Sequence, residues 1–440
     1  MNKRALAVYT LIAMIVLLVV AFIFIPPGVL AILLGVLPSV VPPGLYLTGK
    51  ILDTPPDPLQ VIIALCEWAR RSWRSVLRSG LVVLAVLFVL PPVEPARFRP
   101  GAASAPVPVP GFPPVPVAVP AAGRLLWRHK TGQKVESRPV VVRDTVYVGS
   151  WYGTFMALDV RSGLRRWTFT ADGSFFSGAV VVQDTAYVGS KDQRVYALDT
   201  MLGKPEWLFA TDGDIRSDPV VAGDKVFIGS ADGRLYALHT ATGKAHWSYR
   251  AGGEVSGPAV SGGVVYLASE EGVVHAVDAD SGTLIWKRRM GAKTDSSPVV
   301  AGRTVFIGCE DGKVYALDAA TGEERWTYQT HGEVDTRPAV AGGIVYAGSQ
   351  DHKLYALDAL TGRERWAHPV EGPIHFSGPV VAGGRVYFGS EDDRVHAVNA
   401  VTGETEWSYL TGADINSSPT VAGGAVFVGG DDGYVYALRA

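Results

Sequence analysis

The side chains with the most varied chemistry stand at two positions of a repeated loop, three residues and one residue before a recurring proline. The proline is Pro139, Pro219, Pro258, Pro298, Pro338, Pro379 or Pro419, with Ala179 in one repeat. The position three residues before it holds Glu136, Phe176, Arg216, Val255, Asp295, Asp335, Phe376 and Asn416. Arg138, Asp218 and Arg337 come directly before it, and His375 adjoins Phe376. Such varied side chains on a repeated frame are typical of a binding face.

These residue types favour binding over catalysis. Asp295 and Asp335 could ligate a cation with Glu136, but a calcium site needs six to eight oxygen ligands around one ion. The sequence contains no catalytic triad, zinc-ligand spacing or phosphate-binding loop, and no Cys-x-x-Cys-His motif for haem. None of its nine histidines forms a pair at a spacing typical of metal ligands. We expect no catalytic residue and no metal site. The alternative to a binding face is a solvated rim of mixed ion pairs.

A repeat must position these loops. The pattern Ala-x-Asp-x-x-x-Gly-x-x-x-Trp recurs, with intervals of 39 to 41 residues between its tryptophans. They are Trp127, Trp167, Trp207, Trp247, Trp286, Trp326, Trp366 and Trp407. The distance from each proline (or Ala179) to the next tryptophan is 28 residues in all seven complete repeats. Length varies only between a tryptophan and the following proline, in the loops that carry the varied side chains.

Each repeat predicts four short strands. Apolar runs rich in Val and Tyr alternate with turns rich in Gly, Asp and Pro, and four strands in about 40 residues form one propeller blade. The C-terminal Ala437 to Ala440 and the segment Ala121 to Trp127 complete one split motif. The sequence therefore predicts an all-β, eight-bladed propeller over residues 121–440, closed by its first strand. We interpret the tryptophans as structural contacts between blades, and the motif Asp as a turn residue.

The repeat resembles the tryptophan-docking motif of propellers built from pyrroloquinoline quinone-like (PQQ-like) repeats. The motif is complete in five copies, such as Ala316/Asp318/Gly322/Trp326, and His239, Asn399 and Arg439 replace its Asp in three others. The resemblance implies the fold and two possible functions. One is the non-catalytic scaffold branch, similar to outer-membrane assembly lipoproteins. The other is a quinoprotein dehydrogenase, which uses PQQ and calcium and a catalytic Asp. Such enzymes typically carry long insertions and a vicinal cysteine pair, which this sequence lacks.

Residues 1–93 read as a membrane anchor. Ala5 to Ile25 is an uncharged run long enough to span a bilayer, with a secretory signal peptide as the competing interpretation. Gly28 to Leu47 and Leu81 to Val93 are further apolar runs. Residues 61–78 predict a basic amphipathic helix at the membrane surface, or else a helix packed on the spans. Residues 94–120 are a Pro-rich linker that favours an extended spacer.

Charge predicts the orientation of this anchor. Keeping both basic segments in the cytoplasm places the propeller outside if there are three spans, and in the cytoplasm if the third apolar run only lies on the surface. Residues 1–120 carry nine Lys/Arg and four Asp/Glu, for a net charge of +5. The propeller carries the remaining 31 and 38, for −7, which argues against nucleic-acid binding. Cys66 and Cys309 lie far apart and give no disulfide framework. The preferred function is a membrane-tethered module that binds a protein or peptide partner, with no cofactor.

Overall fold

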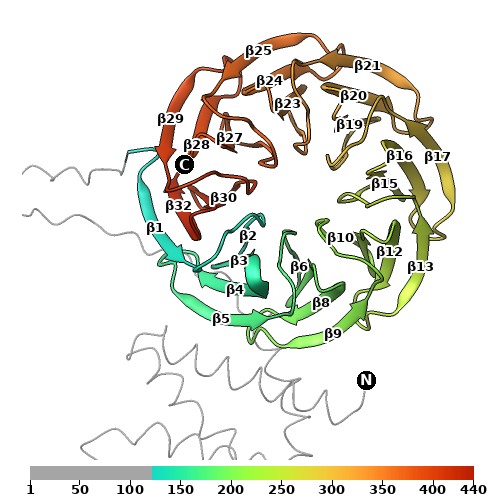
Figure 1. Cartoon of the computed structure of the whole chain (residues 1–440), viewed down its shortest axis with the longest axis horizontal. Coiled ribbons are helices and arrows are strands. Elements are labelled where there is room, and N and C mark those ends of the chain that lie inside the picture. Colours follow the sequence, from blue (N-terminus) through green and yellow to red (C-terminus); the bar gives the residue numbers. More distant parts are fainter. Residues whose placement is uncertain (1–120) are drawn as a thin grey trace, which may run out of the picture. The chain divides into compact units, whose positions relative to one another are not determined.

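The computed structural model describes residues 121–440, which form a closed ring of eight antiparallel, four-stranded sheets (Figure 1). This confirms the predicted eight-bladed, all-β propeller. Its only helix is the single turn η2 (Trp151–Gly153), and no helix in the described part is long and apolar enough to cross a membrane. The predicted anchor (1–93), with its amphipathic helix (61–78), and the linker (94–120) lie outside the described residues.

The strands repeat in a fixed order from the centre of the ring outward. The innermost strands are β2 (Val140–Val142), β6 (Val180–Val182), β10 (Val220–Ala222), β14 (Ala259–Ser261), β18 (Val299–Ala301), β22 (Ala339–Ala341), β26 (Val380–Ala382) and β30 (Thr420–Ala422). The second strands are β3 (Thr145–Ser150), β7 (Thr185–Ser190), β11 (Lys225–Gly229), β15 (Val264–Ser269), β19 (Thr304–Gly308), β23 (Ile344–Ser349), β27 (Arg385–Ser390) and β31 (Ala425–Gly429).

The third strands are β4 (Thr154–Asp159), β8 (Arg194–Asp199), β12 (Arg234–His239), β16 (Val273–Asp278), β20 (Lys313–Asp318), β24 (Lys353–Asp358), β28 (Arg394–Asn399) and β32 (Tyr434–Arg439). The outer strands are β5 (Arg165–Thr170), β9 (Pro205–Ala210), β13 (Ala245–Arg250), β17 (Leu284–Arg289), β21 (Glu324–Gln329), β25 (Glu364–Pro369), β29 (Thr405–Leu410) and β1 (Leu125–Lys130). We number the blades 1 to 8 by their innermost strands in chain order.

Strand β1 closes the ring. It pairs antiparallel with β32, with Trp127 opposite Ala437, and so becomes the outer strand of blade 8 in the order β1-β32-β31-β30. Figure 1 shows the two strands side by side in cyan and red. The predicted closure is confirmed. It leaves no sheet edge exposed between the first and the last blade, where another chain could pair.

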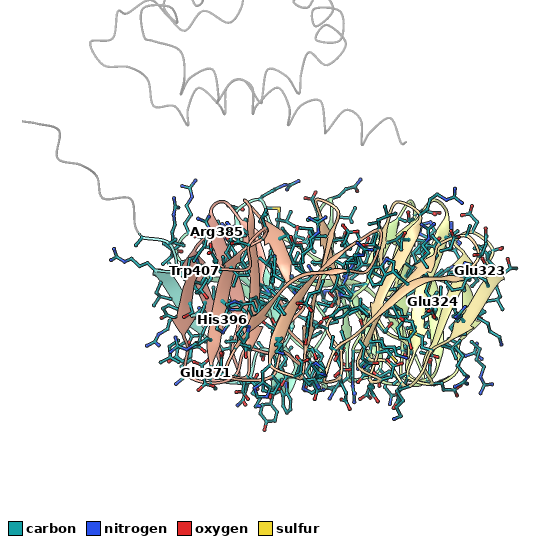
Figure 2. All side chains as sticks on the ribbon, turned by 90° about the horizontal axis from the view of Figure 1, so that it is seen from above. Glu323, Glu324, Glu371, Arg385, His396 and Trp407 are labelled. Atoms are coloured by element: carbon teal, nitrogen blue, oxygen red, sulfur yellow. The ribbon has the colours of Figure 1, made fainter. Side chains whose placement is uncertain are left out.

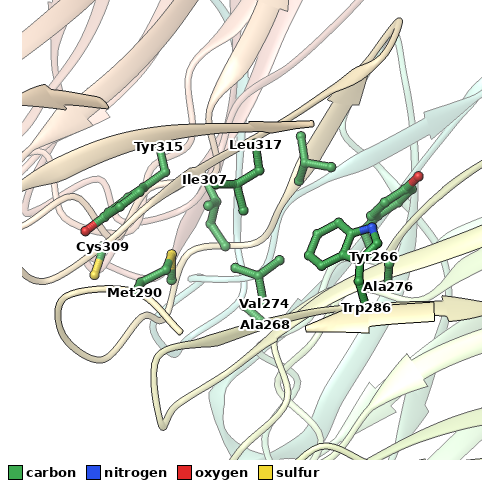
Figure 3. Packing of buried hydrophobic residues seen from close by; sticks show 11 residues of the cluster. Tyr266, Ala268, Val274, Ala276, Trp286, Met290, Ile307, Cys309, Tyr315 and Leu317 are labelled. Carbon is green, nitrogen blue, oxygen red and sulfur yellow. The ribbon is translucent and has the colours of Figure 1, made fainter. Parts of the chain in front are cut away.

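The core lies between neighbouring blades. Between blades 4 and 5, buried side chains of both sheets meet in one cluster that includes Trp286 and Leu317 (Figure 3). The Trp286 indole donates its N–H to Ala319 O at 2.9 Å. It packs on Gly322, where a Cβ would come within 2.5 Å of the ring. The glycine of the motif is therefore required by this contact and by its φ of +73°.

The alternating strand directions give the ring two faces. We call the mouth face the one that carries the loops from each outer strand to the next innermost strand, together with the turns between second and third strands. The opposite face carries the other two sets of turns. Figure 2 shows the ring from the side, with Glu371 of a mouth-face loop and Arg385 at the start of β27 near opposite edges.

Candidate functional site at the channel mouth

A cavity of about 560 Å³ opens at the mouth face. All of the predicted binding residues except His375 line it: Glu136, Arg138, Phe176, Arg216, Asp218, Asp295, Asp335, Arg337, Phe376 and Asn416. His375 lies directly beside it, because its ring stacks on Phe376 with centroids 3.7 Å apart. The structure therefore brings together residues from seven of the eight loops, which are spread over some 280 residues of sequence.

Most mouth loops have an alternating pattern that points these side chains inward. An apolar residue such as Phe175 or Ile215 is fully buried, the next residue faces the cavity, and the following hydroxyl is buried again. In blade 1 that hydroxyl is Ser137, whose Oγ accepts the N–H of Gly149 at 2.9 Å and donates to its carbonyl oxygen at 2.8 Å. These two bonds hold the loop against the second strand, so the residues on either side of the hydroxyl turn toward the cavity.

The two loops of unusual length shift this pattern. In the short loop before blade 4, Val255 is 2% exposed and takes the place of the buried apolar residue. Counting back from the proline aligns Val255 with the exposed residues of the other loops, but its side chain is buried because this loop is one residue shorter, and it borders the cavity from that position. In the long loop before blade 7, Ile374 is buried, and both His375 and Phe376 follow it. The additional residue places two rings at the mouth where other loops offer one.

The residues directly before the prolines form an inner ring. Arg138 reaches over Gly178 to Asp218, with its Nη2 3.0 Å and its Nε 3.1 Å from Oδ2. Asp218 Oδ1 also accepts the N–H of Gly178 at 2.6 Å. A Cβ on Gly178 would lie 3.2 Å from both side chains, so the glycine leaves the space through which this ion pair forms.

Arg337 also belongs to the inner ring but is not paired in this way. Its guanidinium has no hydrogen-bond or ion-pair partner within residues 121–440. Solvent in the channel reaches the side chain. Desolvation by the surrounding protein lowers its pKa, the nearby Asp218 carboxylate partly offsets this, and Arg138 lowers the pKa further. A charged group held between protein walls, with free donors, is suited to binding an anionic group such as a carboxylate.

An aromatic sector covers blades 1 and 2. Trp151 and Phe176 pack with ring centroids 5.3 Å apart, and the Lys191 ammonium lies 3.9 Å from the Phe176 centroid. Tyr152, beside Trp151, is 73% exposed with a left-handed φ of 60°. Trp151, Tyr152 and Lys191 were not predicted from the sequence. A signal was available, since most of the equivalent turns carry Asp where blade 1 carries Tyr152.

An acidic sector covers blades 4 to 6. Burial raises the pKa of Glu254, Asp295 and Asp335, and repulsion between neighbouring carboxylates adds to the shift. Asp335 Oδ2 accepts a hydrogen bond from Gln350 at 2.6 Å and faces His375 Nε2 at 3.6 Å. Its buried Oδ1 has no partner within the described residues. The mouth is therefore polarised, with aromatic rings and a lysine on one side and carboxylates with an unused acceptor on the other.

The repeated blade is also what connects this chain to known proteins. The family model described as outer membrane protein assembly factor BamB matches residues 115–199, 173–256, 252–376 and 373–440. The chain belongs to this family. The match covers the whole propeller of this BamB-family chain, including the split blade. No curated protein sequence matches it.

Solved structures show the same architecture. BamB from Moraxella catarrhalis superposes with a TM-score of 0.63 at 20% identity, covering 72% of this chain and 99% of that one. The computationally designed Ika8 protein gives 0.64 at 17% identity, with 72% and 99% covered. The quinohemoprotein alcohol dehydrogenase from Comamonas testosteroni gives 0.61 at 18% identity, with 72% and 76% covered. At these identities the similarity shows the fold alone, which a BamB-family propeller shares with an enzyme.

Proposed function

We propose that this BamB-family propeller is a binding module that holds a protein or peptide partner at its mouth face without catalysing a reaction, and that its N-terminal segment tethers it to the cell membrane. The observation that carries the proposal is the gathering of the symmetry-breaking side chains around one cavity. Eight nearly identical blades need no such variety for stability. The propeller is expected on the exterior face of the membrane, with the cytoplasmic face as the alternative.

The polarity of the mouth indicates the kind of partner. Phe176 and Phe376 offer rings to the solvent, and Phe376 is 48% exposed. Aromatic side chains of this kind are typical anchors of protein interfaces. Arg216 and Arg337 can pair with acidic groups of the partner, and Asp295 and Asp335 with basic ones, which fixes orientation more than affinity. A peptide segment with apolar and charged residues of both signs fits this surface best.

The test is capture of partners by the full chain from its native membranes. The test variant is Phe176→Ala/Arg216→Ala/Phe376→Ala. A matched control on the opposite face is Arg161→Ala/Leu164→Ala/Leu360→Ala, in which the same kinds of exposed side chain are removed. We expect the mouth variant to lose its partners by at least about tenfold, as the loss of interface anchors implies, and the control to keep them. Equal recovery by both variants would refute the mouth as the binding face.

The same preparation tests the second proposal, a PQQ- and calcium-dependent dehydrogenase that oxidises an alcohol or sugar. PQQ carries carboxylates that Arg216 and Arg337 could pair with, and Asp295 and Asp335 are groups that calcium accepts. A quinone titration followed by absorption, with calcium present and a dye as electron acceptor, measures both binding and turnover. Stoichiometric quinone binding with oxidation of an alcohol or sugar would replace the binding-module proposal.

A further inference from the structure

A recurring ion cluster stabilises the opposite face of several blades. In blade 1, Arg166 of the outer strand donates to Asp159, the motif residue, at 2.7 Å and to Asp144, in the turn after β2, also at 2.7 Å. Blades 5 and 6 keep the motif pair, as Arg325 with Asp318 and Arg365 with Asp358. The outer-strand arginine always follows the motif aspartate by seven residues.

Blade 3 has different residues at the same three positions. Asp224 is the counterpart of Asp144, His239 replaces the motif aspartate, and His246 replaces the arginine. The two imidazole rings lie nearly parallel, 23° apart in orientation, with centroids at 5.4 Å. His246 Nε2 is 3.8 Å from Asp224 Oδ2. One nitrogen from each ring and one oxygen of Asp224 all lie within 4.8 Å of one another.

This exchange changes what the cluster can hold. A guanidinium carries its own positive charge and has no lone pair to offer, so the blade 1 cluster is complete in itself. Two imidazoles and a carboxylate offer two nitrogen donors and one oxygen donor, a set that suits zinc and related divalent transition metals. We propose that Asp224, His239 and His246 bind one zinc-class divalent ion on the opposite face of blade 3. This site is independent of the partner-binding mouth.

Zinc binding requires the three ligand side chains to move closer together. Tetrahedral zinc with bonds of about 2.1 Å to nitrogen brings its ligand atoms to roughly 3.4 Å from one another. In the structure the three ligand atoms lie within 4.8 Å of one another. His246 and Asp224 are exposed, so their side chains can rotate inward without disturbing the core. The pair His239 and His246 was not predicted from the sequence because seven residues is not a usual ligand spacing. The fold brings the two together across the turn between β12 and β13.

Two contacts oppose binding and limit the affinity. His239 Nδ1 accepts the N–H of Ala241 at 3.1 Å, so the ring must give up this bond when it coordinates an ion. Motif aspartates such as Asp318 accept two backbone N–H groups, at 2.9 and 3.1 Å, so His239 is held less firmly in its turn. Lys225 lies 3.4 Å from Asp224 Oδ1, although its closer partner is Asp280 at 2.9 Å. Its positive charge disfavours a second cation nearby.

The experiment is zinc titration of the full chain in detergent, after treatment with a chelator, followed by calorimetry. Cobalt absorption serves as a separate report of nitrogen ligation. We expect one equivalent to bind with a Kd on the order of 1 µM, about −8 kcal/mol. The key variant is His239→Asp/His246→Arg, which rebuilds the blade 1 cluster around Asp224 and should fold normally. It should lose at least about tenfold in affinity.

Further variants keep the result interpretable. His246→Gln alters only an exposed side chain and should weaken binding even if the double variant folds poorly. Lys225→Gln should strengthen it by removing the adjacent charge. His331→Gln, at an exposed position of a mouth-face loop, is the control and should bind zinc like the unaltered chain. No zinc uptake by the unaltered chain, or equal uptake by the rebuilt double variant, would overturn the proposal.

Discussion

Gly123 lies against the indole of Trp407, so that a Cβ on the glycine would stand 2.9 Å from Cδ2 of the ring. The same arrangement joins Gly163 to Trp127 and Gly203 to Trp167. Gly123 therefore supplies, at the junction of blades 7 and 8, the glycine–tryptophan contact that the other pairs of neighbouring blades make. Its N–H also donates to Arg439 O at 2.8 Å. The first residues of the propeller thus pack against β29, the outer strand of blade 7, by the contact that joins the other neighbouring blades.

The first prediction concerns this closing contact. Gly123→Ala should destabilise the propeller by about 1–3 kcal/mol more than Gly342→Ala does, because it adds a clash with a packed ring. Gly342 has a similar left-handed φ of +57° but nothing within 4 Å of a new Cβ, so it controls for backbone strain alone. Denaturant unfolding of both variants measures the difference. Equal losses would show that the Trp407 contact does not hold the ring closed.

The second prediction concerns the interior tryptophans. Trp326 donates its indole N–H to Ala359 O at 3.1 Å and packs on Gly362 of the next repeat. Trp326→Ala should cost about 3–5 kcal/mol of unfolding free energy, because a large cavity opens between two blades. Leu360→Ala, in an 80% exposed turn position nearby, should change stability by less than about 0.5 kcal/mol. A loss below about 1 kcal/mol for Trp326→Ala would contradict its role.

The third prediction contrasts two carboxylates with opposite pKa shifts. The hydrogen bond from Arg365 lowers the pKa of Asp358 to about 2, with Thr361 adding to it. The stabilisation by Asp358 is therefore complete above the ordinary pKa of 3.8 and is lost as the pH falls toward 2. Burial raises the pKa of Asp335 above 3.8. Its charged form opposes folding at neutral pH, and this penalty disappears as the pH falls and the folded protein takes up the proton.

These signs can be measured with two variants. The stability of Asp335→Asn relative to the unaltered chain should be most favourable at pH 7 and should decline as the pH is lowered to 4. The deficit of Asp358→Asn should stay constant over that range, because the Asp358 carboxyl is charged throughout it. Unfolding free energies at each pH provide the comparison. A relative stability of Asp335→Asn that does not change with pH would show that Asp335 is not desolvated.

The fourth prediction is the sidedness of the propeller, which we propose to be exterior. Ser261 is exposed at the end of β14, so Ser261→Cys in a Cys66→Ser background offers an accessible thiol. Cys309 is buried, and the parent without the new cysteine controls for its reactivity. An impermeant thiol reagent should label Ser261→Cys in intact cells. Labelling only after lysis would place the propeller in the cytoplasm.

The fold could be predicted from the sequence because its determinants are local and repeated eight times. Each motif fixes a turn through its Asp and Gly, and each Trp packs against the neighbouring blade. Strand β1 could be assigned to blade 8 because Gly123 and Trp127 are in register with Arg439. In such a repeat, register follows from counting, and one shared length of 28 residues is enough to place every blade.

The site was less predictable, because it depends on departures from the repeat. Counting from the prolines identified residues that border the cavity, but it did not show that the side chain of Val255, in a loop one residue shorter, is buried. Trp151 and Lys191 come from turns between second and third strands, which the loop pattern does not include. The pairing of His239 with His246 was not predicted for a similar reason. Their proximity depends on the pairing of β12 with β13, which no spacing rule for metal ligands describes.

The pairing of β1 with β32 has a consequence for how the protein is made. Strand β1 is synthesised before any blade, and its partner is among the last segments of the propeller to be translated. At roughly 5–20 residues per second, some tens of seconds separate the two events. During that time β1 is a strand without a neighbour, while seven blades assemble behind it. If a nascent chain meets a second one in this interval, its β1 can pair with the β32 of the other molecule. The step that closes the ring is therefore also the step at which two growing molecules can become joined.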